Sequence, residues 1–354
     1  MSLASQQQGW ERQQEALAAQ VIHHDDAPWL LQPGGWAAHL RLVGGLDISF
    51  FPAHRSAASP AVGLPKPTDS SPGAPAAQPG KAEGPSPAAA ERAVAALVVL
   101  SFPGLVLLHV ELLELPALGA PYLPGFLGFR EVPAYMELLR RAAEKGVHPQ
   151  LLLVDGSGVL HPRRCGSASH LGVLSGLPTV GVAKTLLHVD GLPGEKEVRA
   201  AVAAALDAAA QPLPGCGSPA SVQALQAGSS SRSAAAAGAG GSMHPLPGGG
   251  CWLPLVGAHG EELGAALCAG GAAGSNCGTC DSRLLASRRP SFVSVGHRIG
   301  LASALAVVQR CCRHRVPEPI RQADLLSRAE VRRQLGTAAA AVAAAATTPS
   351  STAG

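Results

Sequence analysis

Two long stretches of proline and small residues interrupt this chain and limit where a packed core can form. Residues 56–90 are rich in Pro, Ala, Ser and Gly, and residues 205–250 are rich in Ala, Gly and Ser. Such segments bury too little apolar area to offset the entropy that they lose on ordering. We therefore expect flexible insertions at about 56–90 and 205–250, placed in surface loops. Residues 336–354 read as a disordered tail whose alanines favour at most a transient helix.

Short apolar runs between these stretches carry the strand signals. The runs with the length and composition of strands are 40–51, 93–103, 104–115, 149–158, 178–184 and 291–300. Apolar residues at helical spacing, or runs of small residues between strands, predict helices over 131–145, 167–175 and 301–312.

The order of these segments predicts the fold class. Three strands come first, which suggests an antiparallel meander, and helices then alternate with strands, which suggests parallel strands added to the same sheet. We expect an α/β protein with one mixed sheet flanked by helices. Residues 1–39 would form an N-terminal helical segment, and residues 40–335 a single domain that carries the insertions.

Composition excludes several classes of protein. The 354 residues carry a formal net charge of +3, which is compatible with nucleic-acid binding but does not argue for it. The start of the chain has no secretory signal pattern, and no apolar run is long enough for a membrane span. The eight cysteines are then expected to be reduced thiols, in a monomer located in the cytoplasm, the nucleus or both.

Two acidic residues stand where buried strands end. Only 24 residues of the chain are acidic, yet Asp47 follows the apolar segment VGGL and Asp155 follows LLLV. A carboxylate buried without a partner costs several kcal/mol, so such a residue is usually a cap, a turn former or a ligand. Asp155 is also compatible with an ordinary Asp-Gly turn, and Asp47 with a structural cap.

Two further residues complete a possible site. Glu131 lies at the start of the 131–145 helix, where an acid also suits the helix dipole, and His297 lies between a strand and a helix. Taken together, three carboxylates and a histidine at element ends are typical of a divalent-metal site. Oxygen ligands favour Mg²⁺, with Mn²⁺ as a substitute, and such ions activate water and polarise phosphates.

Several segments resemble the endonuclease V family, whose fold is similar to that of ribonuclease H. The matching segments are VGGLDISF (43–50), PYLPGFLGFRE (121–131), LLLVDGSGVLHPRRCGSASHLGV (151–173), LPTVGVAK (177–184), SVGHRIGLASAL (294–305) and RVPEPIRQADLLSR (315–328). They cover most of 40–190 and 290–330 in the family's order, and the 151–173 block is highly specific.

The resemblance implies roles for the residues of the site. Asp47 and Asp155 would hold the catalytic metal, and Glu131 would complete the acidic cluster. His297 would orient or activate the attacking water, and Lys184 would act electrostatically at the scissile bond.

The same resemblance implies a substrate-binding region. Tyr122, in PYLP, would be the stacking residue of a wedge that separates strands, because an aromatic ring between prolines makes a stiff blade. The residues implied for the pocket of an extruded base are Leu127, Gly156, Gly158 and Gly181. His161, Arg163 and His170 would contact phosphate or support the acids, with a structural role as likely for His170.

The implied reaction is hydrolysis of a phosphodiester on the 3′ side of inosine, leaving a 3′-OH and a 5′-phosphate. Its substrate would be inosine-containing single-stranded RNA or DNA. The segment RVPEP resembles the animal-type members of the family, which favours RNA. Two alternatives stay open: a non-cleaving protein that binds inosine RNA, and a ribonuclease H-type nuclease that needs no inosine.

Overall fold

The computed structural model of the chain describes residues 3–33, 35–52, 91–118, 120–210, 243–247, 249–270 and 288–346. The predicted insertion at 56–90 and most of the one at 205–250 lie outside these residues. The helices within the described ranges are each too short or too polar to cross a membrane.

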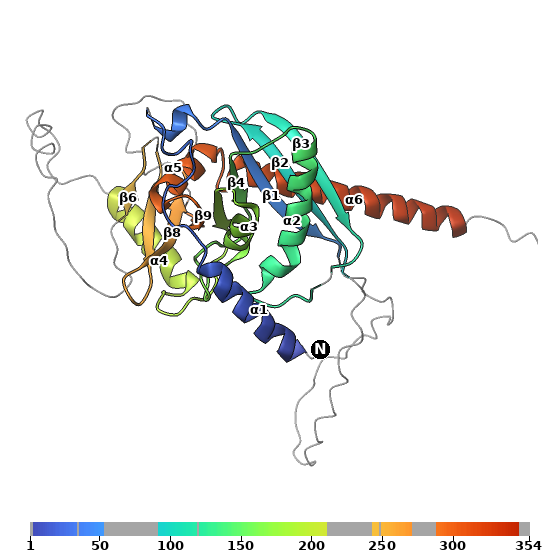
Figure 1. Ribbon diagram of the computed structural model, residues 1–354, viewed down its shortest axis with the longest axis horizontal. Helices are drawn as coiled ribbons and strands as arrows, with labels where there is room; N and C mark the ends of the chain where they lie inside the picture. Colours follow the sequence, from blue (N-terminus) through green and yellow to red (C-terminus); the bar gives the residue numbers. More distant parts are fainter. Residues whose placement is uncertain are drawn as a thin grey trace, which may run out of the picture.

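A nine-stranded mixed sheet runs through the molecule in the order β3-β2-β1-β4-β5-β9-β8-β7-β6 (Figure 1). Its first half consists of β1 (Leu42–Phe50), β2 (Ala93–Ser101), β3 (Leu107–Leu115), β4 (Leu151–Val154) and β5 (Thr179–Ala183). The first three strands form an antiparallel meander, and β4 and β5 run parallel to β1. The expected mixed α/β sheet is therefore confirmed, as are these strand positions.

The second half of the sheet is antiparallel. Its strands are β9 (Ser291–His297), β8 (Glu262–Cys268), β7 (Cys251–Val256) and β6 (His244–Pro245). Strand β9 pairs with β5, and β8 and β7 continue from it under the helix α4 (Glu195–Ala210). Strands β6 to β8 and helix α4 were not predicted. Strand β8 is rich in Ala and Gly, which have low strand propensity, and α4 runs into the Ala- and Gly-rich stretch that was expected to be a flexible insertion.

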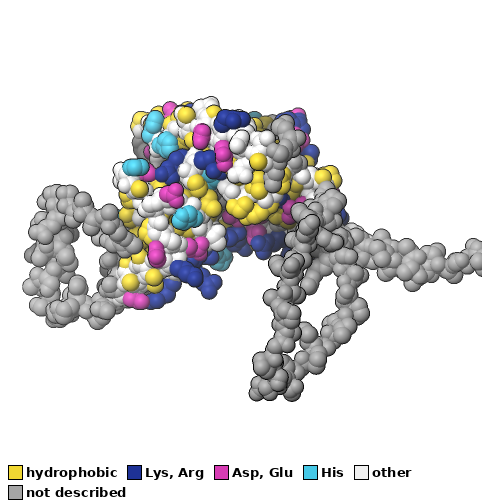
Figure 2. Space-filling model, turned by 90° about the horizontal axis from the view of Figure 1, so that it is seen from below, with side chains coloured by type: hydrophobic (Ala, Val, Ile, Leu, Met, Phe, Trp, Pro, Cys, Tyr) yellow, Lys and Arg dark blue, Asp and Glu magenta, His cyan; other side chains and the backbone are white. Residues whose placement is uncertain are grey.

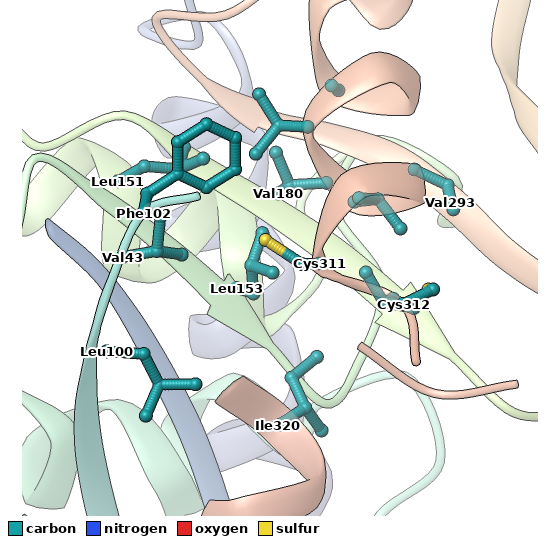
Figure 3. Close-up of a cluster of buried hydrophobic side chains, with 14 of the residues drawn as sticks. Val43, Leu100, Phe102, Leu151, Leu153, Val180, Val293, Cys311, Cys312 and Ile320 are labelled. Carbon is teal, nitrogen blue, oxygen red and sulfur yellow. The ribbon is translucent and has the colours of Figure 1, made fainter. Parts of the chain in front are cut away.

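Helices cover both faces of the sheet and form three layers (Figure 1). Helices α5 (Leu301–Cys311) and α6 (Glu318–Ala346) pack on one face. Figure 3 shows this core, where Val43, Leu151 and Leu153 of the sheet lie with Cys311 of α5 and Ile320 of α6. Helices α2 (Leu127–Glu144) and α3 (Ser167–Ser175) pack on the other face.

Gly45 in β1 allows α6 to lie directly on the sheet. A Cβ atom at Gly45 would lie only 2.1 Å from the carbonyl carbon of Pro319, so a side chain there would displace α6. Side chains alternate along a strand, so Val43, Gly45 and Asp47 share the face that α6 covers. This close contact brings the polar side chains of α6 to Asp47.

Three boundaries differ from the expectation. Helix α2 begins at Leu127 rather than 131, because Phe126 and Phe129 at its start pack against Trp10 of the N-terminal helix α1 (Leu3–Ala18). Helix α4 and strand β6 occupy parts of 205–250, and α6 extends through the predicted tail to Ala346. Alanine has the highest intrinsic helix propensity, so an established helix propagates into such a tail.

Candidate active site

Asp47 is buried on the face of β1 that α6 covers. Its exposed fraction is 7%, and its Oδ2 atom lies 3.4 Å from the Ser327 hydroxyl on α6. The Ser327 hydroxyl also lies 2.7 Å from that of Ser49, two residues further along β1. Helix α6 therefore holds the Asp47 side chain against the sheet. Asp47 is not the structural cap of a loop.

Asp155 and Lys184 meet at the carboxyl ends of two parallel strands. Val154 of β4 pairs with Gly181 of β5, so the residues that follow these strands emerge at the same edge of the sheet. Lys184 Nζ donates to Asp155 Oδ2 at 2.6 Å. Burial acts to lower the pKa of Lys184, yet the adjacent Asp155 carboxylate outweighs it and the pKa is raised.

Glu131 reaches the same region from α2, in the opposite layer. Its exposed fraction is 3%, and its Oε2 atom is buried without a hydrogen-bond partner. The hydroxyl of Tyr135, one turn later, is also buried without a partner. Burial first, and then the charges of Asp47 and Asp155, raise the pKa of Glu131 well above its usual range.

Strand pairing brings Asp47 beside Asp155, because the residues just before them in β1 and β4 pair with each other. Burial raises the pKa of Asp47 to about 8, with further contributions from Asp155 and then Asp324, while Lys184 acts in the opposite direction. Three of the expected residues, Asp47, Asp155 and Glu131, are therefore brought together with Lys184.

Asp324 is the member of this cluster that sequence reasoning missed. It lies on α6 one turn before Ser327, whose hydroxyl also donates to its carbonyl oxygen. The sequence feature that could have identified Asp324 is its position in RVPEPIRQADLLSR, where residues 324 and 327 lie on the same face of a helix.

The donor set fits a hard divalent cation. All of its ligating atoms would be carboxylate oxygens, which Mg²⁺ and Mn²⁺ prefer, and a cation would offset the burial and the repulsion that together raise the pKa of Asp47. A buried carboxylate oxygen needs a partner, and the Glu131 Oε2 atom has no hydrogen bond, so a cation could fill this role. In their present rotamers, no three His, Cys, Asp or Glu residues of the described ranges converge at metal-binding distances.

The structure corrects the role expected for His297. Strand β9 is antiparallel to β5, and His297 pairs with Thr179 at the amino end of β5, whereas Lys184 follows the other end. Thr179 and Lys184 are five residues apart along the strand, so His297 and Lys184 are separated by roughly 16 Å in the strand direction. His297 Nδ1 instead accepts a hydrogen bond from Ile22 N at 3.2 Å, and Arg298 N donates to Ile22 O. The motif SVGHRIG thus anchors the N-terminal segment, and His297 does not join the acids.

A cavity of about 250 Å³ lies between α1, the start of α2, and the loops after β4 and β5. Its lining includes the expected residues Tyr122, Leu127, Gly156 and His161, together with Gln14 of α1. The lining mixes apolar side chains with backbone groups and is large enough for a flat heterocycle.

Gly158 and Gly181 have a packing role beside this cavity. A Cβ atom at Gly158 would lie 1.9 Å from Val295 O, and one at Gly181 would lie 2.5 Å from Gly158 N. Neither glycine lines the cavity. Their lack of side chains lets the loop after β4 lie flat on β5 and β9, which fixes the position of Gly156.

His161 and Arg163 support a turn and do not contact the acids. His161 Nε2 lies 2.9 Å from Gly125 O, and Arg163 Nη2 donates to the same oxygen at 3.1 Å. His170 is buried on α3 with its ring edge against Phe129 and its Nδ1 unpartnered, in accordance with a structural role. Burial lowers the pKa of His161 and that of His170 to about 4.

Tyr122 stands at the mouth of the cavity with 65% of its surface exposed. The Arg130 guanidinium lies 5.8 Å from its ring centroid and 5.0 Å from that of Phe50. Figure 2 shows one face of the molecule, where Lys and Arg side chains mix with Asp and Glu side chains. An exposed ring beside a guanidinium, as Tyr122 is beside Arg130, can stack on a base.

Comparisons with known proteins show a sequence likeness to one protein family. The sequence profile of the family described as Endonuclease V matches residues 85–211 and 256–325. Human endonuclease V is 36% identical over 329 residues, which cover 92% of this chain and 84% of the human protein. Asp47 and α1 lie outside the residues matched by the profile.

Solved structures show the same likeness. The catalytic domain of human endonuclease V aligns with a TM-score of 0.61 and 35% identity, covering 95% of this chain and 99% of that domain. A Ciona intestinalis endonuclease V, in complex with a 24mer DNA containing an inosine followed by a ribo-adenosine, aligns with a TM-score of 0.60 and 25% identity. That alignment covers 93% of this chain and 99% of the Ciona chain. The expected ribonuclease H-like fold is confirmed.

Proposed function

This chain belongs to the endonuclease V family, a family of nucleases that hydrolyse phosphodiester bonds, and we propose that it cuts single-stranded RNA or DNA on the 3′ side of inosine. The observation that carries this proposal is the acidic cluster of Asp47, Asp155, Glu131 and Asp324 at the carboxyl edge of the sheet. The Ciona relative in complex with inosine-containing DNA supports the choice of base.

The acids would hold the divalent ion, Mg²⁺ or Mn²⁺, which supplies an activated water and stabilises the leaving oxygen. Asp47 and Asp155 are the main candidate ligands, and the buried Glu131 and the partly buried Asp324 would hold them in place or complete the set. Lys184, paired with Asp155 in this structure, is placed to neutralise charge that develops on the scissile phosphate.

The cavity would receive the extruded base. Inosine presents an N1–H donor and an O6 acceptor, the reverse of adenosine at the same edge. Backbone groups beside Gly156 and Leu127 suit such a readout, because a glycine lets a flat base approach the main chain. Tyr122 would stack against the neighbouring base and keep the strand open.

The test uses four matched strands, of RNA and of DNA, each with inosine or adenosine at one position. With Mg²⁺ we expect cleavage only of the inosine strands, more rapidly in RNA, with a 5′-phosphate on the downstream product. Asp47→Ala and Asp155→Ala should abolish cleavage and retain binding, and Asp190→Ala, which removes a fully exposed acid, is the control.

Other outcomes would decide against the proposal. Binding of inosine strands without cleavage would indicate a non-cleaving inosine-binding protein. Cleavage of an RNA–DNA hybrid that contains no inosine would indicate a ribonuclease H-type nuclease. Near wild-type cleavage by Asp47→Ala would remove the metal assignment.

A further inference from the structure

Three side-chain donors converge on one carbonyl oxygen beside the cavity. Gly125 O accepts hydrogen bonds from Gln14 Nε2 at 2.9 Å, from His161 Nε2 at 2.9 Å and from Arg163 Nη2 at 3.1 Å. A carbonyl has two lone pairs, so three donors are more than its ordinary complement. The position of this backbone group is therefore strongly determined by its surroundings.

Gln14 is the donor that comes from outside the predicted catalytic domain. It lies on α1, is 1% exposed, and also donates to Cys165 O at 2.9 Å. Its Oε1 atom accepts from Arg163 Nε at 2.6 Å. The two Nε2 hydrogens and the Oε1 atom thus tie the turn at Gly125 to the loop that follows β4.

The turn held in this way carries the mouth of the cavity. Gly125 has φ of +80°, a left-handed conformation that other residues rarely adopt, and it lies three residues after Tyr122 and just before α2. Gln14, Tyr122 and Gly125 all line the cavity. Helix α1 is fixed at this place by Trp10, whose ring stacks on that of Phe129 at 4.9 Å between centroids.

We propose that α1 forms one wall of the base pocket and that Gln14 is a positioning residue for substrate binding. Gln14 holds the Gly125 turn so that Tyr122 and the pocket mouth keep the shape that accepts the extruded purine. This inference rests on the proposed function. Gln14 contacts none of the acids in the cluster. Its loss should therefore affect the binding of the inosine strand more than the chemical step.

The test compares Gln14→Leu and Gln14→Glu with wild type and with Gln13→Leu, a matched change on the exposed face of α1. Gln14→Leu removes all three hydrogen bonds, and Gln14→Glu keeps the size but loses the amide donor. We expect both Gln14 variants to raise KM for an inosine strand about tenfold or more, with kcat per folded molecule within about twofold. Gln13→Leu should match wild type.

A merely structural role would give a different pattern. Loss of folded protein lowers the apparent kcat and leaves KM unchanged, so thermal melts and the KM–kcat split separate the two explanations. Should Gln14→Leu fail to fold, the nearly isosteric Gln14→Glu gives the same comparison. Unchanged KM in the folded Gln14 variants would overturn this inference alone. A wild-type protein that neither binds nor cuts inosine strands would overturn the proposed function, and this inference with it.

Discussion

Acidification should loosen the pocket wall through His161. Both ring nitrogens of this buried residue are used in the neutral form, because Nε2 donates to Gly125 O and Nδ1 accepts from Arg163 N at 3.1 Å. A second proton on Nδ1 would face the Arg163 N–H donor. Burial accordingly lowers the pKa of His161 from 6.5 to about 4.

The sign and size of the effect follow from linkage. Below pH 6.5 the unfolded chain takes up a proton at His161, whereas the folded chain does so only near pH 4. The contribution to stability is therefore complete above pH 6.5 and is lost as the pH falls toward 4. At pH 5 the loss of this His161 contribution lowers the free energy of unfolding by about 2 kcal/mol, since each pH unit between the two pKa values is worth about 1.4 kcal/mol.

Urea unfolding of wild type and His161→Gln at pH 7 and pH 5 measures this contribution. The raised pKa of Asp47 changes stability in the opposite direction over this range, because the folded state then holds the extra proton. The informative quantity is therefore the difference between the two proteins at each pH. It should shrink by about 2 kcal/mol on acidification. A difference that stays constant between pH 7 and pH 5 would refute the reasoning.

Other substitutions test separate parts of the structure. Asp324→Ala should reduce kcat on the order of a hundredfold or more while the Kd for an inosine strand is kept, and near-normal turnover would exclude Asp324 from the site. Tyr122→Ala should weaken binding of the strand on the order of tenfold in a fluorescence anisotropy assay, since stacking on one base is worth about 1–3 kcal/mol. Gly45→Val should destabilise the protein by about 1–3 kcal/mol or prevent folding, because its side chain would strike Pro319, and an unchanged Tm would contradict that close contact.

The sequence was sufficient for the parts of the site that depend on local pattern. Asp47 and Asp155 could be found because a carboxylate after a buried apolar run is unusual. Only Asp155 follows the end of its strand, because β1 continues past Asp47 to Phe50, but the parallel pairing of β1 with β4 ends just before both residues. The meander and the parallel strands were likewise predictable from the order of apolar runs. Lys184 and Tyr122 needed the resemblance, since each has an ordinary structural interpretation when taken alone. Glu131 could be proposed from the residues only as part of the set with Asp47, Asp155 and His297.

The misses depend on long-range packing. His297 ends a strand, but the direction of that strand in the sheet decides at which edge it emerges, and its residues do not encode that direction. Asp324 comes from α6, whose approach to β1 depends on Gly45. Gln14 is a polar residue among other glutamines on α1, and only the docking of that helix distinguishes it from Gln13.

The packing of α6 on β1 also sets the order in which a working centre can arise during synthesis. Asp47 leaves the ribosome before Asp324 and Ser327, which lie far later in the sequence. A nascent chain, which folds from its amino end, lacks the helix that covers Asp47 until α6 has been translated. The acidic cluster can therefore be completed only after α6 has folded onto β1.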